Sequence, residues 1–179
     1  MMKTRDLTGC ALSAALIAIC SWISIPAALP FTMQTFAIFL TAGIFGGKKA
    51  FLSMLLYLLL GMIGLPVFAG FKGGIGVILG TTGGYIFGFL LTALFLWLSE
   101  GWWKNHTMRF FISCLPALAL CYLCGTFWML LLYIQNSQPL SLAAVLSMCV
   151  IPFIVPDVIK IACAALLCKR FAGLHLFRS

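Results

Sequence analysis

Long apolar segments separated by short polar stretches dominate the chain. Six segments stand out, and their approximate ranges are 7–25, 34–47, 50–66, 80–99, 109–133 and 142–170. Most of them are long enough for a helix that crosses the ~30 Å hydrocarbon core of a bilayer. The second segment is short for a full crossing, and prolines interrupt the last one. The pattern predicts an all-α integral membrane protein, a bundle of six transmembrane helices.

The composition agrees with this fold class. Of the 179 residues, 64% are hydrophobic and only 8% are charged. No soluble fold of this size buries so much apolar side-chain surface. We therefore expect one membrane-embedded domain over residues 1–179, surrounded by membrane lipid.

The basic residues separate by their predicted side of the membrane. Of the 11 Lys and Arg residues, all except Lys72 and Lys160 lie at the termini or in loops that six crossings place on one side. The positive-inside rule makes this side cytoplasmic. We therefore expect both termini in the cytoplasm and the protein in the cell membrane. The net charge of +8 is scattered in ones and twos, so we expect no nucleic-acid partner.

Asp157 and Lys160 are unusual because they lie within the last apolar segment. A charged side chain at mid-helix costs about 2.5–3.5 kcal/mol on insertion scales. Asp157 precedes Lys169 by about 18 Å of helix, which places it inside the hydrocarbon core. Spacing i, i+3 puts both side chains on one helix face. The pair forms either a ligand pocket open to the outer side or a self-satisfied structural ion pair; we favour the pocket.

Polar and glycine-rich loops face the predicted outer side. The first contains Phe31, Thr32 and Gln34, and the second runs from Gly64 to Gly80 and is followed by Tyr85. The second loop is apolar, whereas a solvated linker would be rich in Ser and charge. We expect this loop to lie against the mouth of the bundle or over a ligand, with its glycines allowing close approach.

The proline before Asp157 suggests where its helix begins. Proline is well tolerated at the first helical position, so we expect Pro156 to begin a helix whose first turn contains Asp157. Free backbone N–H groups would then lie nearby. Asp157 would accept N–H bonds from a small ligand, and Lys160 would donate to a carbonyl or carboxylate.

The sequence does not predict a metal or cofactor site. Cys121 and Cys124 form a C-x-x-C within an apolar segment, and the histidines, His106 and His175, lie on the predicted cytoplasmic side. No nucleotide-binding loop is present, because Gly-Lys-Ser/Thr does not follow the glycines at 76–80. A membrane-embedded enzyme that uses the Asp/Lys pair in acid–base chemistry remains an alternative, although it lacks a second nucleophile.

Small residues in the first segment form a close-packing pattern. Ala11-x-x-x-Ala15 and Ala14-x-x-x-Ala18 let helix backbones approach each other closely in lipid. The partner of this surface is either another helix of the same bundle or a separate subunit.

The motifs together resemble the BioY family, the biotin-binding S components of energy-coupling factor (ECF) transporters. The resemblance covers nearly the whole chain. The matching stretches are Pro30-Phe-Thr-Met-Gln-Thr35, residues 56–70 (LYLLLGMIGLPVFAG), Thr82-Gly-Gly-Tyr85, Gly125-Thr-Phe-Trp128, and Pro152-Phe-Ile154 leading to Asp157-Val-Ile-Lys160.

The resemblance implies a six-helix S component that binds biotin from the outside and has cytoplasmic termini. It implies partner subunits that hydrolyse ATP and a transmembrane coupling subunit. It implies that Asp157, Lys160 and Tyr85 contact the ligand. The first-loop motif extends this implied contact to Gln34 and Phe31. An S component for another small vitamin is the nearest alternative.

The resemblance also implies docking on the coupling subunit through Ala11 and Ala15. The chain departs from the family pattern at two positions, where Thr81 replaces a common proline and Pro156 replaces a common glycine. Both departures alter the backbone near the expected site.

Overall fold

Helices make up nearly all of the fold. The computed structural model describes residues 4–25, 30–104, 106–135 and 141–172. Two short strands, β1 (Ser24–Ile25) and β2 (Phe31–Thr32), pair antiparallel between the first two helices. The helices in the described ranges are α1 (Thr4–Trp22), α2 (Gln34–Phe45), α3 (Gly47–Met62), α4 (Ile75–Leu79), α5 (Gly83–Leu98), α6 (Glu100–Trp103), α7 (Thr107–Gln135), α8 (Leu142–Cys149) and α9 (Ile151–Ala172).

Each of the six predicted segments contains a helix of 12 residues or more, but the last segment divides into two helices. The backbone leaves helical geometry at Val150, with φ −124° and ψ −56°, and α9 begins at Ile151. Pro152 lies in the first turn of α9, where a missing N–H costs little. Pro156 lies inside α9, and Asp157 is in the second turn. The prediction that Pro156 begins this helix is therefore wrong, because neighbouring helices support a proline-containing helix in a membrane bundle.

The number of full membrane crossings is not decided by helix length. Among the described residues, Thr107–Gln135 and Leu142–Phe171 are long and apolar enough to cross a membrane, whereas α2 and α5 are apolar but shorter. The 12 residues of α2 span only about 18 Å. Six crossings thus remain a prediction. Large exposed apolar side chains such as Leu12, Leu123 and Leu166 form the kind of surface that lipid covers.

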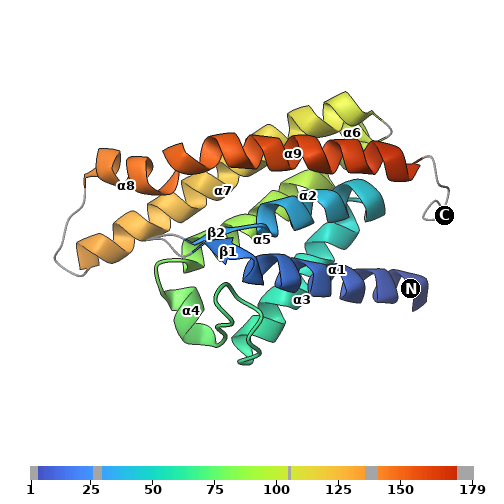
Figure 1. Cartoon of the computed structure of the whole chain (residues 1–179). Helices are drawn as coiled ribbons and strands as arrows, with labels where there is room; N and C mark the ends of the chain where they lie inside the picture. Colours follow the sequence, from blue (N-terminus) through green and yellow to red (C-terminus); the bar gives the residue numbers. More distant parts are fainter. Residues whose placement is uncertain (1–3, 26–29, 105, 136–140, 173–179) are drawn as a thin grey trace.

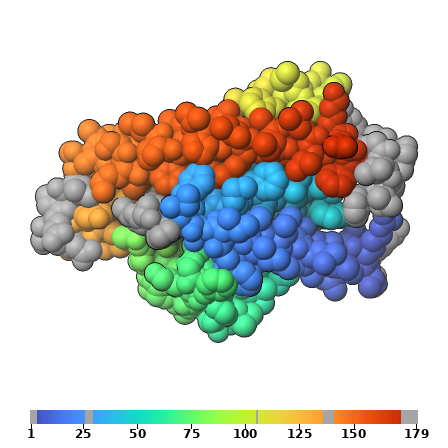
Figure 2. All heavy atoms as spheres, viewed as in Figure 1, coloured from blue at the N-terminus to red at the C-terminus, as the bar shows by residue number. Residues whose placement is uncertain are grey.

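Helix α2 lies at the centre of the bundle. It contacts α1, α3, α5 and α9, while α5 packs most extensively against α7 (Figure 1). Figure 2 shows α9 stretched across one face and packed directly onto the α2 segment. Ala37, Phe39 and Ala42 of α2 are fully buried. Residues at the start of α2 therefore face the interior of the bundle.

The two ends of the bundle differ in character. The start of α1, the end of α9, the α2–α3 junction and α6 lie at one end (Figure 1). Lys49 pairs with Asp6 at 2.7 Å there, and the Gly47 N–H donates to a Glu100 oxygen at 3.0 Å. The opposite end contains the β1–β2 pair, α4 and the loop that carries Lys72. The described basic residues that the sequence assigns to the cytoplasm lie at the starts of α1, α3 and α7, after α6 and at the end of α9, and thus belong to this first end.

The glycine-rich loop folds onto the second end. Phe68 is buried and its ring meets Tyr57 edge to face, with centroids 5.5 Å apart. It lies against Gly61, where any Cβ atom would overlap the Phe68 ring. Glycine at position 61 is thus needed for this loop to close against α3.

Candidate functional site

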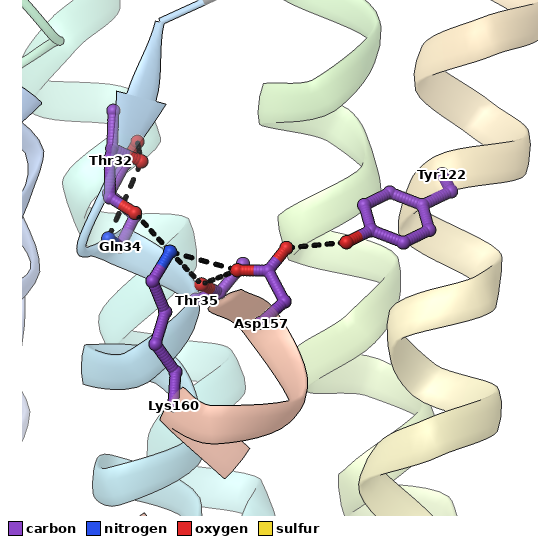
Figure 3. Close-up of polar contacts among 6 residues, drawn as sticks. All are labelled: Thr32, Gln34, Thr35, Tyr122, Asp157 and Lys160. Carbon is purple, nitrogen blue, oxygen red and sulfur yellow. Dashed lines mark hydrogen bonds and ion pairs between the residues drawn. The ribbon is translucent and has the colours of Figure 1, made fainter. Parts of the chain in front are cut away.

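Asp157 and Lys160 form a buried ion pair on one face of α9 (Figure 3). Lys160 Nζ lies 2.8 Å from Asp157 Oδ1, and the residues are 3% and 6% exposed. Because α9 packs against α2 and α7, the pair points into the bundle rather than toward lipid. The prediction that both charges share one helix face is confirmed.

Neighbouring elements complete the hydrogen bonds of this pair. Thr35 of α2 donates its hydroxyl to Asp157 Oδ1 at 3.0 Å, and Tyr122 of α7 donates to Oδ2 at 2.6 Å. Lys160 donates to the Thr32 carbonyl of β2 at 2.6 Å and to Thr35 Oγ1 at 3.3 Å. Each carboxylate oxygen thus has a donor, and the three ammonium hydrogens have three acceptors. These hydrogen bonds offset the free-energy cost of burying two charges.

Phe31 supports Lys160 rather than facing the cavity. The Lys160 ammonium lies 3.9 Å from the centroid of the Phe31 ring, within range of a cation–π interaction. The same ring stacks on Phe153 with centroids 5.7 Å apart. Phe31 is not among the cavity-lining residues. Its contact with a ligand remains a prediction, and the contact that the structure shows is with Lys160.

Gln34 lies at the start of α2 and is oriented by hydrogen bonds at both ends of its amide. Its Nε2 donates to the Tyr57 hydroxyl at 2.8 Å, and its Oε1 accepts from Thr32 Oγ1 at 3.4 Å. Gln34 is buried and lines the cavity. Its side chain therefore has a fixed direction beside the ion pair.

Tyr85 reaches the site because two glycines bring α5 and α7 together. A Cβ atom on Gly84 would collide with Trp128, and one on Gly125 would collide with the Tyr85 ring. Tyr85 is buried, and its hydroxyl donates to the Cys149 carbonyl at 3.4 Å. The Gly-Gly-Tyr and Gly-Thr-Phe-Trp stretches are thus two sides of one helix contact.

A cavity of about 320 Å³ lies between these groups. Small-molecule sites typically enclose about 300–1,000 Å³, with mostly apolar walls and a few placed polar groups. This cavity fits that description, and the glycine-rich loop forms part of its wall as expected from the sequence. The main lining residues are Thr32, Gln34, Thr35, Tyr57, Phe68, Ala69, Lys72, Val77, Thr81, Tyr85, Phe89, Tyr122, Phe153, Asp157 and Lys160.

Sequence reasoning missed three polar members of the site. Thr35, Tyr57 and Tyr122 bind Asp157 or Gln34 directly, yet none was singled out as a site residue. Each is an isolated hydroxyl within an apolar segment. A threonine hydroxyl commonly bonds its own helix backbone, and a tyrosine commonly packs as an aromatic side chain, so spacing alone does not mark these residues.

The two alanine pairs of α1 point in different directions. Ala14 and Ala18 are buried in the bundle, whereas Ala11 and Ala15 are exposed. The first pair therefore serves internal packing. The second remains available for a partner, and its docking role stays a prediction.

Apolar helices around a partly open cavity with a buried, fully bonded ion pair in its wall are typical of a membrane protein with a small-molecule pocket. The comparison with known families narrows this class. The chain belongs to the BioY family, whose model matches residues 1–175. Membership places it among transport proteins rather than enzymes.

Similar proteins agree over the full length of the chain. The chain is 38% identical over 176 residues to the biotin transporter BioY of Thermotoga maritima, covering 97% of this chain and 99% of the relative. It is 36% identical over 178 residues to the biotin transporter BioY2 of Lactococcus lactis, covering 99% and 92%.

A solved structure shares the fold. The chain resembles the crystal structure of the S-component for biotin from an ECF-type ABC transporter, with a TM-score of 0.81 and 26% identity. The match covers 99% of this chain and 100% of that chain. The predicted S-component-like helical bundle is therefore confirmed.

Proposed function

We propose that this protein binds biotin from the outside of the cell membrane and serves as the substrate-specific component of an ECF-type transporter. The observation that carries the proposal is the cavity, with the Asp157–Lys160 network in its wall. The names of the similar proteins supply the identity of the ligand.

The chemistry of the cavity suits biotin. Its ureido group offers two N–H donors and one carbonyl acceptor, and its fused rings are otherwise apolar. Asp157 accepts the N–H groups, while Lys160 and Gln34 lie where a carbonyl would find donors. The rings of Tyr85 and Phe89 provide apolar contact area for the fused rings.

Binding would require an exchange of hydrogen bonds. Lys160 already donates to Asp157, Thr35 and the Thr32 carbonyl. A ligand carbonyl would therefore take the place of one acceptor, and the Thr32 carbonyl belongs to the β1–β2 pair at the cavity edge. Ligand binding is thus expected to change the hydrogen bonding of the β1–β2 pair.

Uptake against a gradient needs an energy source from partner subunits. The sequence carries no nucleotide-binding motif, so we assign ATP hydrolysis to separate subunits and docking to the exposed Ala11 and Ala15. We place both termini in the cytoplasm on the positive-inside rule. The cavity then lies at the outer end of the bundle.

Equilibrium binding of labelled biotin to the purified protein in detergent tests the proposal, with riboflavin and thiamine as controls. We expect saturable binding of biotin and no binding of the other two vitamins. Binding of riboflavin or thiamine instead would contradict the assigned substrate. No binding by a well-folded sample would contradict the binding function of the isolated chain.

A further inference from the structure

We propose that Lys72 binds the carboxylate of the ligand and makes the protein selective for an anionic ligand. This inference rests on the proposed function, since it assigns the two ends of biotin to two parts of the cavity. Lys72 lies on the loop before α4 and lines the cavity, where it has not yet been given a role.

Among the described charged residues that line the cavity, Lys72 has no acidic partner. The chain has three acidic residues, and each of them pairs with a lysine other than Lys72. The pairs are Asp6 with Lys49, Glu100 with Lys104, and Asp157 with Lys160. The Asp157–Lys160 pair is neutral as a unit, so Lys72 gives the described lining a net charge of +1. A monoanionic ligand would neutralise it.

The backbone at Lys72 is fixed by a tight turn, while its side chain is exposed at the cavity. The Phe68 N–H donates to the Lys72 carbonyl at 2.9 Å, which closes a tight turn on the buried Phe68. Gly70 and Phe71 take left-handed backbone angles in this turn, with φ +72° and +56°. The Phe71 ring stacks on Trp22 with centroids 4.9 Å apart. A left-handed phenylalanine costs free energy, so these contacts must fix the turn.

The loop that carries Lys72 leads into α4, on the side of the bundle away from α9, which carries the ion pair (Figure 1). The loop before α4 and the second turn of α9 both line the cavity, and Figure 1 shows α4 and α9 on opposite sides of the bundle. Biotin likewise carries its ureido group and its carboxylate at opposite ends. With the ureido group at Asp157 and Lys160, the carboxylate reaches toward Lys72.

Thr81 adds neutral donors at the same side of the cavity. It lines the cavity just before α5, where the helix N-terminus favours negative charge. Within the described residues, neither its N–H nor its hydroxyl has a hydrogen-bond partner. A proline at this position would supply neither donor, so the threonine strengthens the anion preference of this chain.

Binding of biotin and of its neutral amide, biotinamide, separates the carboxylate from the rest of the ligand. We would measure the affinity of both for the unmodified protein and for Lys72→Gln. Lys169→Gln removes the same charge from an exposed position at the other end of the bundle and is the matched control. The amide also serves as a folding control for each variant.

We expect the unmodified protein and Lys169→Gln to bind biotin about tenfold more tightly than the amide, as for a charge-assisted hydrogen bond. Lys72→Gln should weaken the binding of biotin but not that of the amide, so that the two affinities become about equal. An unchanged ratio in Lys72→Gln, or an equal loss for both ligands, would overturn the role of Lys72 and leave the proposed function intact. Failure of the unmodified protein to bind either ligand would overturn both proposals.

Discussion

At the scale of single residues, the Asp157–Lys160 pair has a structural role and a proposed ligand-binding role, which mutation can separate. Its hydrogen bonds join α2, α7, α9 and β2, so it contributes to the fold. It also lines the cavity, so it is placed to contact a ligand. Removing one partner of a buried ion pair costs about 3–5 kcal/mol, because the remaining charge is left uncompensated.

Single and double substitutions of this pair should therefore differ in stability but not in binding. We expect Asp157→Asn and Lys160→Ala each to lower biotin affinity tenfold or more, while the protein still inserts into the membrane. Both should lower the melting temperature in detergent. The double change Asp157→Leu with Lys160→Met should regain much of that stability without regaining binding, since apolar residues of similar volume replace buried pairs well.

The control for this series is Lys49→Ala, which breaks the partly exposed ion pair with Asp6 at the other end of the bundle. It should leave biotin affinity unchanged. Unchanged affinity in both Asp157→Asn and Lys160→Ala would make the buried pair purely structural.

At the scale of elements, the contact between α5 and α7 positions the aromatic side of the cavity. Gly125 of α7 lies against the Tyr85 ring, and Gly88 of α5 lies against Cys121. In lipid, small residues at a helix contact permit the close approach that stabilises it. The position of Tyr85 thus depends on a residue without a side chain on the neighbouring helix.

Adding one methyl group at this contact should displace Tyr85. We expect Gly125→Ala to cost about 1–3 kcal/mol through overpacking and to weaken biotin binding about tenfold. Thermal unfolding and equilibrium binding measure the two effects. Gly101→Ala is the matched control, because a Cβ atom at Gly101 meets no neighbour within 4 Å. Wild-type stability and affinity in Gly125→Ala would show that the contact is looser than the structure indicates.

The elements were largely predictable from the sequence because hydrophobicity dominates a membrane bundle. Apolar segments have to be helical in lipid, so the six segments located the long helices. Two intramembrane charges at i, i+3 spacing located the ion pair for the same reason. Gln34 and Tyr85 line the same cavity as that pair, and their contact with a ligand stays a prediction.

The details that sequence reasoning missed depend on packing between helices. Tyr122 and Thr35 are ordinary hydroxyl residues until the bundle brings them to Asp157. Pro156 was expected to begin α9, yet the helix continues through it from Ile151 because α2 and α7 support it. Ligand contact by Phe31 remains a prediction; what sequence reasoning did not foresee is that its ring lies against the Lys160 ammonium.

At the scale of the whole molecule, the proposed binding and docking surfaces are separated. The cavity and its loops occupy one end of the bundle, while the start of α1, the end of α9 and the Lys49–Asp6 pair occupy the other. The exposed alanines of α1 lie on the outside of the helix that carries the internal Ala14 and Ala18 contact. A change at the exposed alanines should therefore affect assembly without affecting the ligand.

We expect Ala15→Trp to abolish close docking of α1 on a coupling subunit while the protein remains folded. A bulky ring at a close helix contact costs about 1–3 kcal/mol or more, so recovery of the complex should fall about tenfold or more. The measurement is co-purification with co-expressed coupling and ATPase subunits, alongside biotin binding by the isolated chain. Leu123→Trp on the exposed side of α7 introduces the same ring elsewhere and should leave both unchanged. Full recovery of the complex with Ala15→Trp would exclude this face of α1 as the docking surface, and the partner would then have to contact another lipid-facing helix.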